Sequence, residues 1–281
     1  MRRKHYFVWM LTTALTAASV MPMTVYAQPA FASGGEVKVV EGDVNGELQG
    51  GVMSPGAMAI EGSDLKVNGN VSGGLVSDGS TVTVNGNVTG NGIDTVIAKK
   101  GTVTVNGTVT ATDLSEKTGV LASNGSNLTV GDTEVGGKES TGVIAESGSK
   151  ATAGNVKVSG EYMTGTSACG DSTVHVKGNV TADGNGMTGV SVHDGDKSSL
   201  IVDGDVTATG ENSVGIYGET GTIKIGGDVS GREAVITKGK ADVTVGGSVS
   251  GTLVGIVAGG NAAVSVKGDA GTKTGAGMFV Q

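Results

Sequence analysis

Apolar and polar residues alternate in short segments along most of this chain. In residues 81–88, Val82 and Val84 alternate with threonine up to an Asn-Gly pair, and Val88 follows. Strict alternation indicates a half-buried β-strand, and Asn-Gly favours a turn because both residues accept positive φ. The same form recurs in residues 102–109, 156–162, 173–180, 200–206, 223–229, 243–249 and 264–270. The pattern therefore predicts many short strands that each run into a corner.

One residue at that corner marks each copy of the unit. Eleven copies follow one another at intervals of 17 to 28 residues, about 22 on average. The corner position is occupied by Gly42, Gly69, Gly86, Gly107, Asp132, Gly160, Gly178, Gly204, Gly227, Gly247 and Gly268. Internal repetition with a period of this size is typical of solenoids.

A second block of the form Thr-Gly-Val-Ile-Ala follows the first one after a variable interval. It occurs at residues 118–122, 141–145, 188–192, 214–217 and 254–258. This block supplies another wall of the coil, and Gly-Ser or Asp-Gly pairs return the chain to the next first strand. We therefore predict an all-β fold, a parallel β-helix (β-solenoid) of about eleven coils, expected to be right-handed, with valine ladders inside and threonine or lysine ladders outside.

The first 32 residues differ from the rest. Arg2, Arg3 and Lys4 precede an apolar stretch of about 14 residues, and small side chains follow it. This arrangement predicts a secretory signal peptide at residues 1–32, cleaved after Ala32 in preference to Ala27, and a secreted or cell-surface location. The stretch is shorter than the roughly 20 residues that a membrane-spanning helix needs.

The two ends of the repeat region carry their own signals. Residues 33–64 hold a weaker copy around Gly42 and a methionine-bearing stretch with Pro55, which predicts N-terminal capping coils. Residues 65–281 form the predicted β-helix repeat domain. The last residues, 277–281, stop inside a second-type block without a polar cap, so we expect the domain to be truncated at its C-terminus.

Composition excludes several classes of protein. Removal of residues 1–32 leaves 16 basic and 27 acidic residues, a net charge of −11, which disfavours a nucleic-acid partner. Beyond the leader no apolar run approaches 18 residues, so no membrane span is expected after cleavage. Cys169 is the single cysteine, which excludes a disulfide scaffold, and its position predicts a small wall residue rather than a reactive thiol.

Candidate catalytic groups are few. Asp171, His175, His193, Asp194 and Asp196 lie about one coil apart, but Asp-Gly turns at the corners account for them as solvated turn residues. The outward position of the first strand holds no carboxylate; it reads Lys66, Thr83, Thr104, Thr129, Lys157, His175, Ile201, Lys224, Thr244 and Ser265. We therefore predict a non-enzymatic protein with no catalytic, cofactor-binding or metal-binding residues.

The residue after each corner glycine is often acidic or an amide. The row contains Asp43, Asn70, Asn87, Glu161, Asn179, Asp205, Asp228 and Asp269. Stacked carboxylates suit Ca²⁺, but the Gly-Gly-x-Gly-x-Asp nonapeptide of calcium-binding rolls is missing. The favoured interpretation is a ladder of side chains that shapes the turns.

The leader together with the units "VTVNGNVTG", "TGVIAESGS" and "TGVLASNGS" resembles the repetitive β-helical passenger and adhesin-like proteins of bacterial surfaces, as in autotransporters. That resemblance spans most of residues 37–280 and implies an exported β-helix with an adhesive or structural role. The units "VDGDV" and "IGGDV" also look like those of bactofilins, which polymerise.

These observations favour an exported, surface-displayed structural or adhesive stalk. Its expected partner is a host or cell-surface glycan or protein, bound through the coil-edge segments that vary most, 110–118, 181–188 and 207–214. Two alternatives stay open. One is a glycan-active β-helix enzyme, a lyase or hydrolase, and the other is a scaffold that associates with itself end to end.

Overall fold

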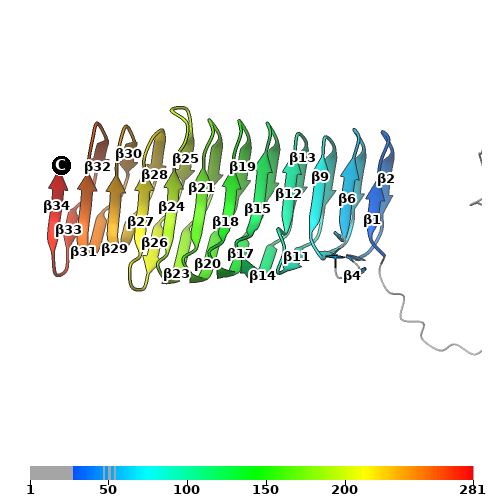
Figure 1. Ribbon diagram of the computed structural model, residues 1–281, viewed down its shortest axis with the longest axis horizontal. Helices are drawn as coiled ribbons and strands as arrows, with labels where there is room; N and C mark the ends of the chain where they lie inside the picture. The colour runs from blue at the N-terminus through cyan, green and yellow to red at the C-terminus, as the bar shows by residue number, and fades with distance from the viewer. Residues whose placement is uncertain (1–27, 47, 50–51, 54, 281) are drawn as a thin grey trace, which may run out of the picture.

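The computed structural model describes residues 28–46, 48–49, 52–53 and 55–280 (Figure 1). This part of the chain is a stack of β-coils, and it contains no helix long and apolar enough to cross a membrane. The predicted all-β parallel β-solenoid is thereby confirmed, whereas its winding direction stays a prediction. Each coil contributes three short strands, so the strands form three faces.

The first face is an eleven-stranded parallel sheet with one strand per coil. Its strands carry the alternating segments recognised in the sequence, with Val82 paired to Val103 and Val84 to Val105. The strands are β2 (Val37–Val40), β7 (Asp64–Val67), β10 (Thr81–Val84), β13 (Thr102–Val105), β16 (Asn127–Val130), β19 (Lys150–Ala153), β22 (Thr173–Val176), β25 (Ser199–Val202), β28 (Thr222–Ile225), β30 (Asp242–Val245) and β32 (Ala263–Val266).

The second face follows each corner glycine or asparagine. Its strands are β3 (Val44–Asn45), β8 (Val71–Ser72), β11 (Val88–Asn91), β14 (Val109–Ser115), β17 (Thr133–Lys138), β20 (Val156–Glu161), β23 (Val180–Asn185), β26 (Val206–Thr209), the first parts of β29 (Val229–Thr237) and β31 (Val249–Ala258), and β33 (Ala270–Thr272).

The third face contains the Thr-Gly-Val blocks. Its strands are β1 (Ala30–Ala32), β6 (Ala57–Ile60), β9 (Leu75–Asp78), β12 (Val96–Lys99), β15 (Thr118–Ser123), β18 (Thr141–Ala145), β21 (Thr164–Ala168), β24 (Thr188–Val192), β27 (Val214–Gly218), the second parts of β29 and β31, and β34 (Ala276–Val280). A short antiparallel pair, β4 (Leu48–Gln49) and β5 (Val52–Met53), is inserted in the first coil.

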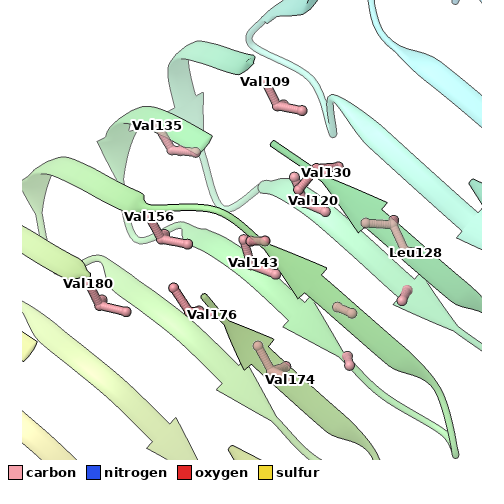
Figure 2. Packing of buried hydrophobic residues seen from close by; sticks show 14 of the residues in the cluster. Val109, Val120, Leu128, Val130, Val135, Val143, Val156, Val174, Val176 and Val180 are labelled. Atoms are coloured by element: carbon pink, nitrogen blue, oxygen red, sulfur yellow. The ribbon is translucent and has the colours of Figure 1, made fainter. Parts of the chain in front are cut away.

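The interior is a narrow column of aliphatic side chains. Figure 2 shows Leu128 and Val174 of the first face and Val109, Val156 and Val180 of the second face, all directed inward and buried. Each such side chain contributes about 1.5–3 kcal/mol on burial, which does not offset the roughly 1–2 kcal/mol per residue lost in ordering a whole coil. A coil is therefore stable only between neighbours, where its backbone also finds hydrogen-bond partners.

One predicted copy of the repeat was placed wrongly. Residues 156–162 do not belong to the first face, because Val156 begins β20 of the second face. The strand of that coil is β19, in which Ala151 pairs with Leu128 and with Val174. Alanine in place of valine at both inward positions weakened the pattern enough to hide it.

The structure also corrects two of the predicted corner residues. The glycines that stack there are Gly131, Gly154 and Gly178, with Gly154 N–H donating to the Gly131 carbonyl at 3.0 Å. Neither Asp132 nor Gly160 occupies the corner glycine position. The outward residue of this coil on the first face is Thr152, which pairs with Thr129, and not Lys157.

The first coil pairs in regular register, but its inward and outward residue types differ from those of the other coils. Lys38 pairs with Leu65, so a lysine occupies an inward position, while Val37 and Val39 face outward and are 76% and 56% exposed. The Lys38 ammonium donates a hydrogen bond of 2.9 Å to the carbonyl of Phe31. Among the described residues, this charge lies at the end of the core, where it disfavours the addition of another apolar coil.

The predicted leader falls largely outside the described residues, since residues 1–27 are not among them. Its last part is described: β1 pairs in register with β6, and Ala30 and Ala32 are buried. The leader itself, the capping coils at residues 33–64 and the boundary with residues 65–281 stay predictions.

Candidate functional site

The coil-edge segments expected to bind a partner lie largely within the second face. Residues 110–118 continue β14, and residues 181–188 continue β23, up to the corner with the third face. At that corner Gly137 pairs with Gly160 and Gly160 with Gly184. A Cβ atom on Gly160 would lie 1.8 Å from the Gly137 carbonyl oxygen, so the backbones of successive coils are in close contact there. Successive coils therefore stack closely at this corner. Residues 181–183 pair directly with residues 207–209 of the next coil, whereas residues 110–118 lie three coils away from residues 181–188.

The candidate catalytic residues separate into two places. His175 lies on the first face, where its Nε2 is 3.0 Å from Asp203 Oδ2. His193 and Asp194 lie in the turn before β25, which Figure 1 shows extending beyond its neighbours, and their Nδ1 and Oδ2 atoms are 3.0 Å apart. Asp171 supports this turn by accepting the N–H of Lys197 at 3.2 Å.

The structure adds a serine that the sequence pattern did not single out. Ser167 Oγ is 3.3 Å from His193 Nε2, so serine, histidine and Asp194 follow one another as in a hydrolase triad. The setting differs from an active site. Ser167 is only 4% exposed, and β21 pairs with both β18 and β24, which occupies the backbone N–H groups that an oxyanion hole requires.

The acidic and amide row holds the corners together. Asn87 Oδ1 accepts the N–H of Thr108 at 2.8 Å, and the Asn87 N–H donates to Asn70 Oδ1 at 2.9 Å. The same bond repeats from Asp132 through Asn155, Asn179, Asp205 and Asp228. Glu161, predicted for this row, lies in β20, and Asn155 takes its place. The turn-ladder interpretation is thereby confirmed, and the described residues contain no group of three or more His, Cys, Asp or Glu arranged to hold a metal ion.

An outward column of apolar residues runs along the third face, and the sequence pattern did not predict it. One side chain of each coil stacks in register on the next one. We call this column the third-face ladder; in chain order it contains Phe31, Met58, Val76, Ile97, Leu121, Ile144, Ser167, Ser191, Tyr217, Ile236 and Val257. The apolar members are half-buried, apart from Phe31, which is 45% exposed.

The size and exposure of the ladder side chains vary along the rod. Ser167 and Ser191 are 4% and 8% exposed and form a dip between larger neighbours. A hollow of about 240 Å³ lies nearer the N-terminus, lined by Val76 and Ile97 of the ladder together with Ile93, Asp94 and Lys117, among others. Contiguous apolar surface of this kind is typical of interaction sites.

Charged and polar residues border the ladder on one side. They lie two positions after a ladder residue, and we call them the rim: Asp78, Lys99, Ser123, Glu146, Cys169, His193, Glu219 and Lys238. The Tyr217 hydroxyl donates to Glu219 Oε1 at 2.5 Å, and Lys238 Nζ lies 5.5 Å from the Tyr217 ring centroid. The hydrogen bond to Glu219 raises the pKa of Tyr217 above its ordinary value, with smaller effects of burial and of the Glu219 charge.

Cys169 is half-buried in this rim. Burial raises the pKa of its thiol, and the negative charges of Glu146 and Asp194 raise it further. A thiol with a raised pKa is a poor nucleophile at neutral pH. The predicted wall position is wrong, because Cys169 follows β21 in the half-buried rim and Ala168 is the buried residue of that wall.

Comparison with protein families, with curated proteins and with solved structures finds no match for this chain. The resemblance to bacterial β-helical adhesins stays a prediction from the repeat units.

Proposed function

We propose that the protein is an exported, non-enzymatic rod that acts as a structural or adhesive stalk outside the cell. The observation that carries this proposal is the uninterrupted parallel stack, whose described outward positions form ladders of stacked side chains. At about 4.8 Å per coil, eleven coils give a rigid spacer on the order of 50 Å long. Export is supported by the leader pattern in residues 1–32.

The position of β1 bears on the processing of the leader. Cleavage after Ala27 retains Ala30 and Ala32 as buried residues of the first coil, whereas cleavage after Ala32 removes that strand. We therefore favour the site after Ala27, because it preserves the pairing of β1 with β6.

The third-face ladder is the surface on which such a stalk binds a partner. Its aliphatic side chains suit a protein surface better than a glycan, since stacking on sugars relies on exposed aromatic rings. The hollow beside Ile97 offers a recess for one large partner side chain.

Secretion tests this function directly. The full chain is expressed in a bacterial host, and the mass of the mature protein is measured in the cytosolic, periplasmic and external fractions. We expect a protein that begins at Gln28 and lies outside the cytosol. Retention in the cytosol with an intact N-terminus would contradict export.

The enzyme alternative rests on the Ser167, His193 and Asp194 contacts alone. We expect the hydrolysis of p-nitrophenyl acetate by the wild type to equal that of Ser167→Ala. A loss of activity in that variant, with an unchanged circular dichroism spectrum, would favour an acyl hydrolase instead.

A further inference from the structure

No other described segment of the chain covers the third-face ladder. It is apolar at nine of eleven positions, and it is straight because each residue stacks in register on the next. We propose that a second copy of this chain covers it, antiparallel to the first, with the two-fold axis along the strand direction and between Ile144 and Ser167. This pairing rests on the proposed function, because it names the protein partner of the ladder as a second copy of the rod; the export experiment tests the stalk separately from the dimer.

The spacing of the ladder selects a partner with the same spacing. Its side chains repeat at the inter-strand distance of about 4.8 Å, which a globular surface does not match over ten steps. A second copy matches it at every step, and a two-fold axis lets one patch serve both partners.

The two-fold axis brings complementary shapes together. Counted from Phe31, the sixth residue of one copy faces the seventh of the other, so Ile144 faces Ser167 and Leu121 faces Ser191. Large side chains thereby enter the dip left by the two buried serines. Further out, Tyr217 faces Ile97, next to the hollow of about 240 Å³. The remaining apolar pairs are Met58 with Val257 and Val76 with Ile236.

The rim charges select the same alignment. Rotation about an axis along the strands places the rim of one copy against the rim of the other, so Lys99 faces Glu219 and Asp78 faces Lys238. Moving the axis onto Ile144 would oppose Asp78 to Glu219, and moving it onto Ser167 would oppose Lys99 to Lys238. A shift to the boundary between Ser167 and Ser191 would oppose Glu146 to Glu219. Opposite charges across an interface fix its register, whereas like charges disfavour alternatives.

The area suits a reversible dimer. A face on the order of 50 Å long and about 12 Å wide covers about 600 Å² per copy, which is at the lower end of specific interfaces. We therefore expect association in the micromolar range.

Charge exchange tests the alignment. Residues 28–281, which contain every described strand, are examined by sedimentation velocity across concentration as wild type, Lys99→Glu, Glu219→Lys and the double variant. We expect each single change to weaken the dimer at least tenfold and the double variant to restore it, because both ion pairs re-form with exchanged signs. Lys224→Glu is the matched control, since Lys224 is exposed on the first face. Circular dichroism verifies that every variant is folded.

Disulfide trapping gives an independent measurement. In a Cys169→Ser background, the double variant Lys99→Cys, Glu219→Cys places two thiols five coils apart in one chain, about 24 Å, which is beyond the reach of a disulfide. We expect oxidation to give a covalent dimer in this variant and not in either single variant.

Four outcomes would overturn the proposal. They are a folded monomer at all concentrations, filaments, dimers with the same affinity in all charge variants, and a monomer that binds phosphatidylcholine vesicles.

Discussion

Asn87 illustrates how one side chain supports two coils. It accepts a backbone hydrogen bond from Thr108 and donates its own N–H to Asn70. Asn87→Ala removes the acceptor, so we expect a loss of about 1 kcal/mol and a Tm lower by about 2–4 °C. Asn87→Asp retains the oxygen between two uncharged neighbours and serves as the control. Equal melting of both variants in scanning calorimetry would contradict the role of this hydrogen bond.

Glycines of the chain differ in what their replacement costs. Gly160 has a φ of 143°, and a Cβ there would lie 1.8 Å from the Gly137 carbonyl oxygen. We therefore expect Gly160→Ala to cost several kcal/mol, because the stacked backbones must separate. Gly148 also has positive φ, 74°, but no atom lies within 4 Å of an added Cβ, so Gly148→Ala should cost only about 1 kcal/mol. Urea unfolding of the two variants checks the difference.

Tyr217 titrates above its ordinary pKa because its hydroxyl donates to Glu219. Glu219→Ala should therefore lower the pKa of Tyr217, as measured by phenolate absorbance of residues 28–281 in a Tyr162→Phe background. A raised pKa in the folded state favours the neutral phenol, so this contribution to stability is present below pH about 10 and is lost as the pH rises above that value. An unchanged titration in Glu219→Ala would contradict the hydrogen bond.

At the scale of the strand, alternation predicted the first face well because its buried residues are mostly β-branched. It failed at β19, whose inward residues are Ala151 and Ala153. There the next alternating segment, Val156 to Val158, was the stronger signal although it belongs to the second face. Register with the neighbouring coils, which a single strand does not reveal, decides such cases.

The third-face ladder was not predictable from the strand alone for a related reason. In β15 Gly119, Val120 and Ala122 are buried, while Leu121 between them points outward. Consecutive apolar residues carry no alternation, so the sequence indicated a wall but not which side chain faces solvent. The Ser167 and His193 contact was equally hidden, because it joins residues 26 positions apart whose adjacency depends on coil length.

Lys38 occupies an inward position of β2, and its replacement tests how this end of the stack is protected. Lys38→Leu places an apolar residue at the inward position and removes the hydrogen bond to the Phe31 carbonyl. We expect this variant to form larger species by end-to-end association, because the end of the core loses its charge. Lys66→Leu is the control, since Lys66 is exposed on the neighbouring strand. Unchanged sedimentation of Lys38→Leu would show that the lysine does not protect this end.

For the molecule as a whole, each coil contacts mainly its two neighbours, so the stack should tolerate the loss of a complete unit. Residues 173–198 form one coil, since Thr173 pairs with Ser199. Their deletion joins two equivalent positions, and we expect a folded rod shorter by about 4.8 Å, measurable by small-angle X-ray scattering. Deletion of residues 173–185 removes only part of a coil and breaks the register at that place, so we expect a lower Tm than that of the complete-coil deletion. Equal Tm values of the two deletion variants would contradict the nearest-neighbour stack.

The direction of the hydrogen bonds has a mechanical consequence. Backbone bonds join one coil to the next, for example Asn106 to Val84 at 2.9 Å, and so they lie along the rod. Tension between the two ends therefore acts on one coil boundary at a time, as in the opening of a zipper. Each coil that detaches releases about 70 Å of extended chain, since about 22 residues extend by roughly 3.3 Å each. Under load, such a rod lengthens in discrete steps and dissipates force before it separates.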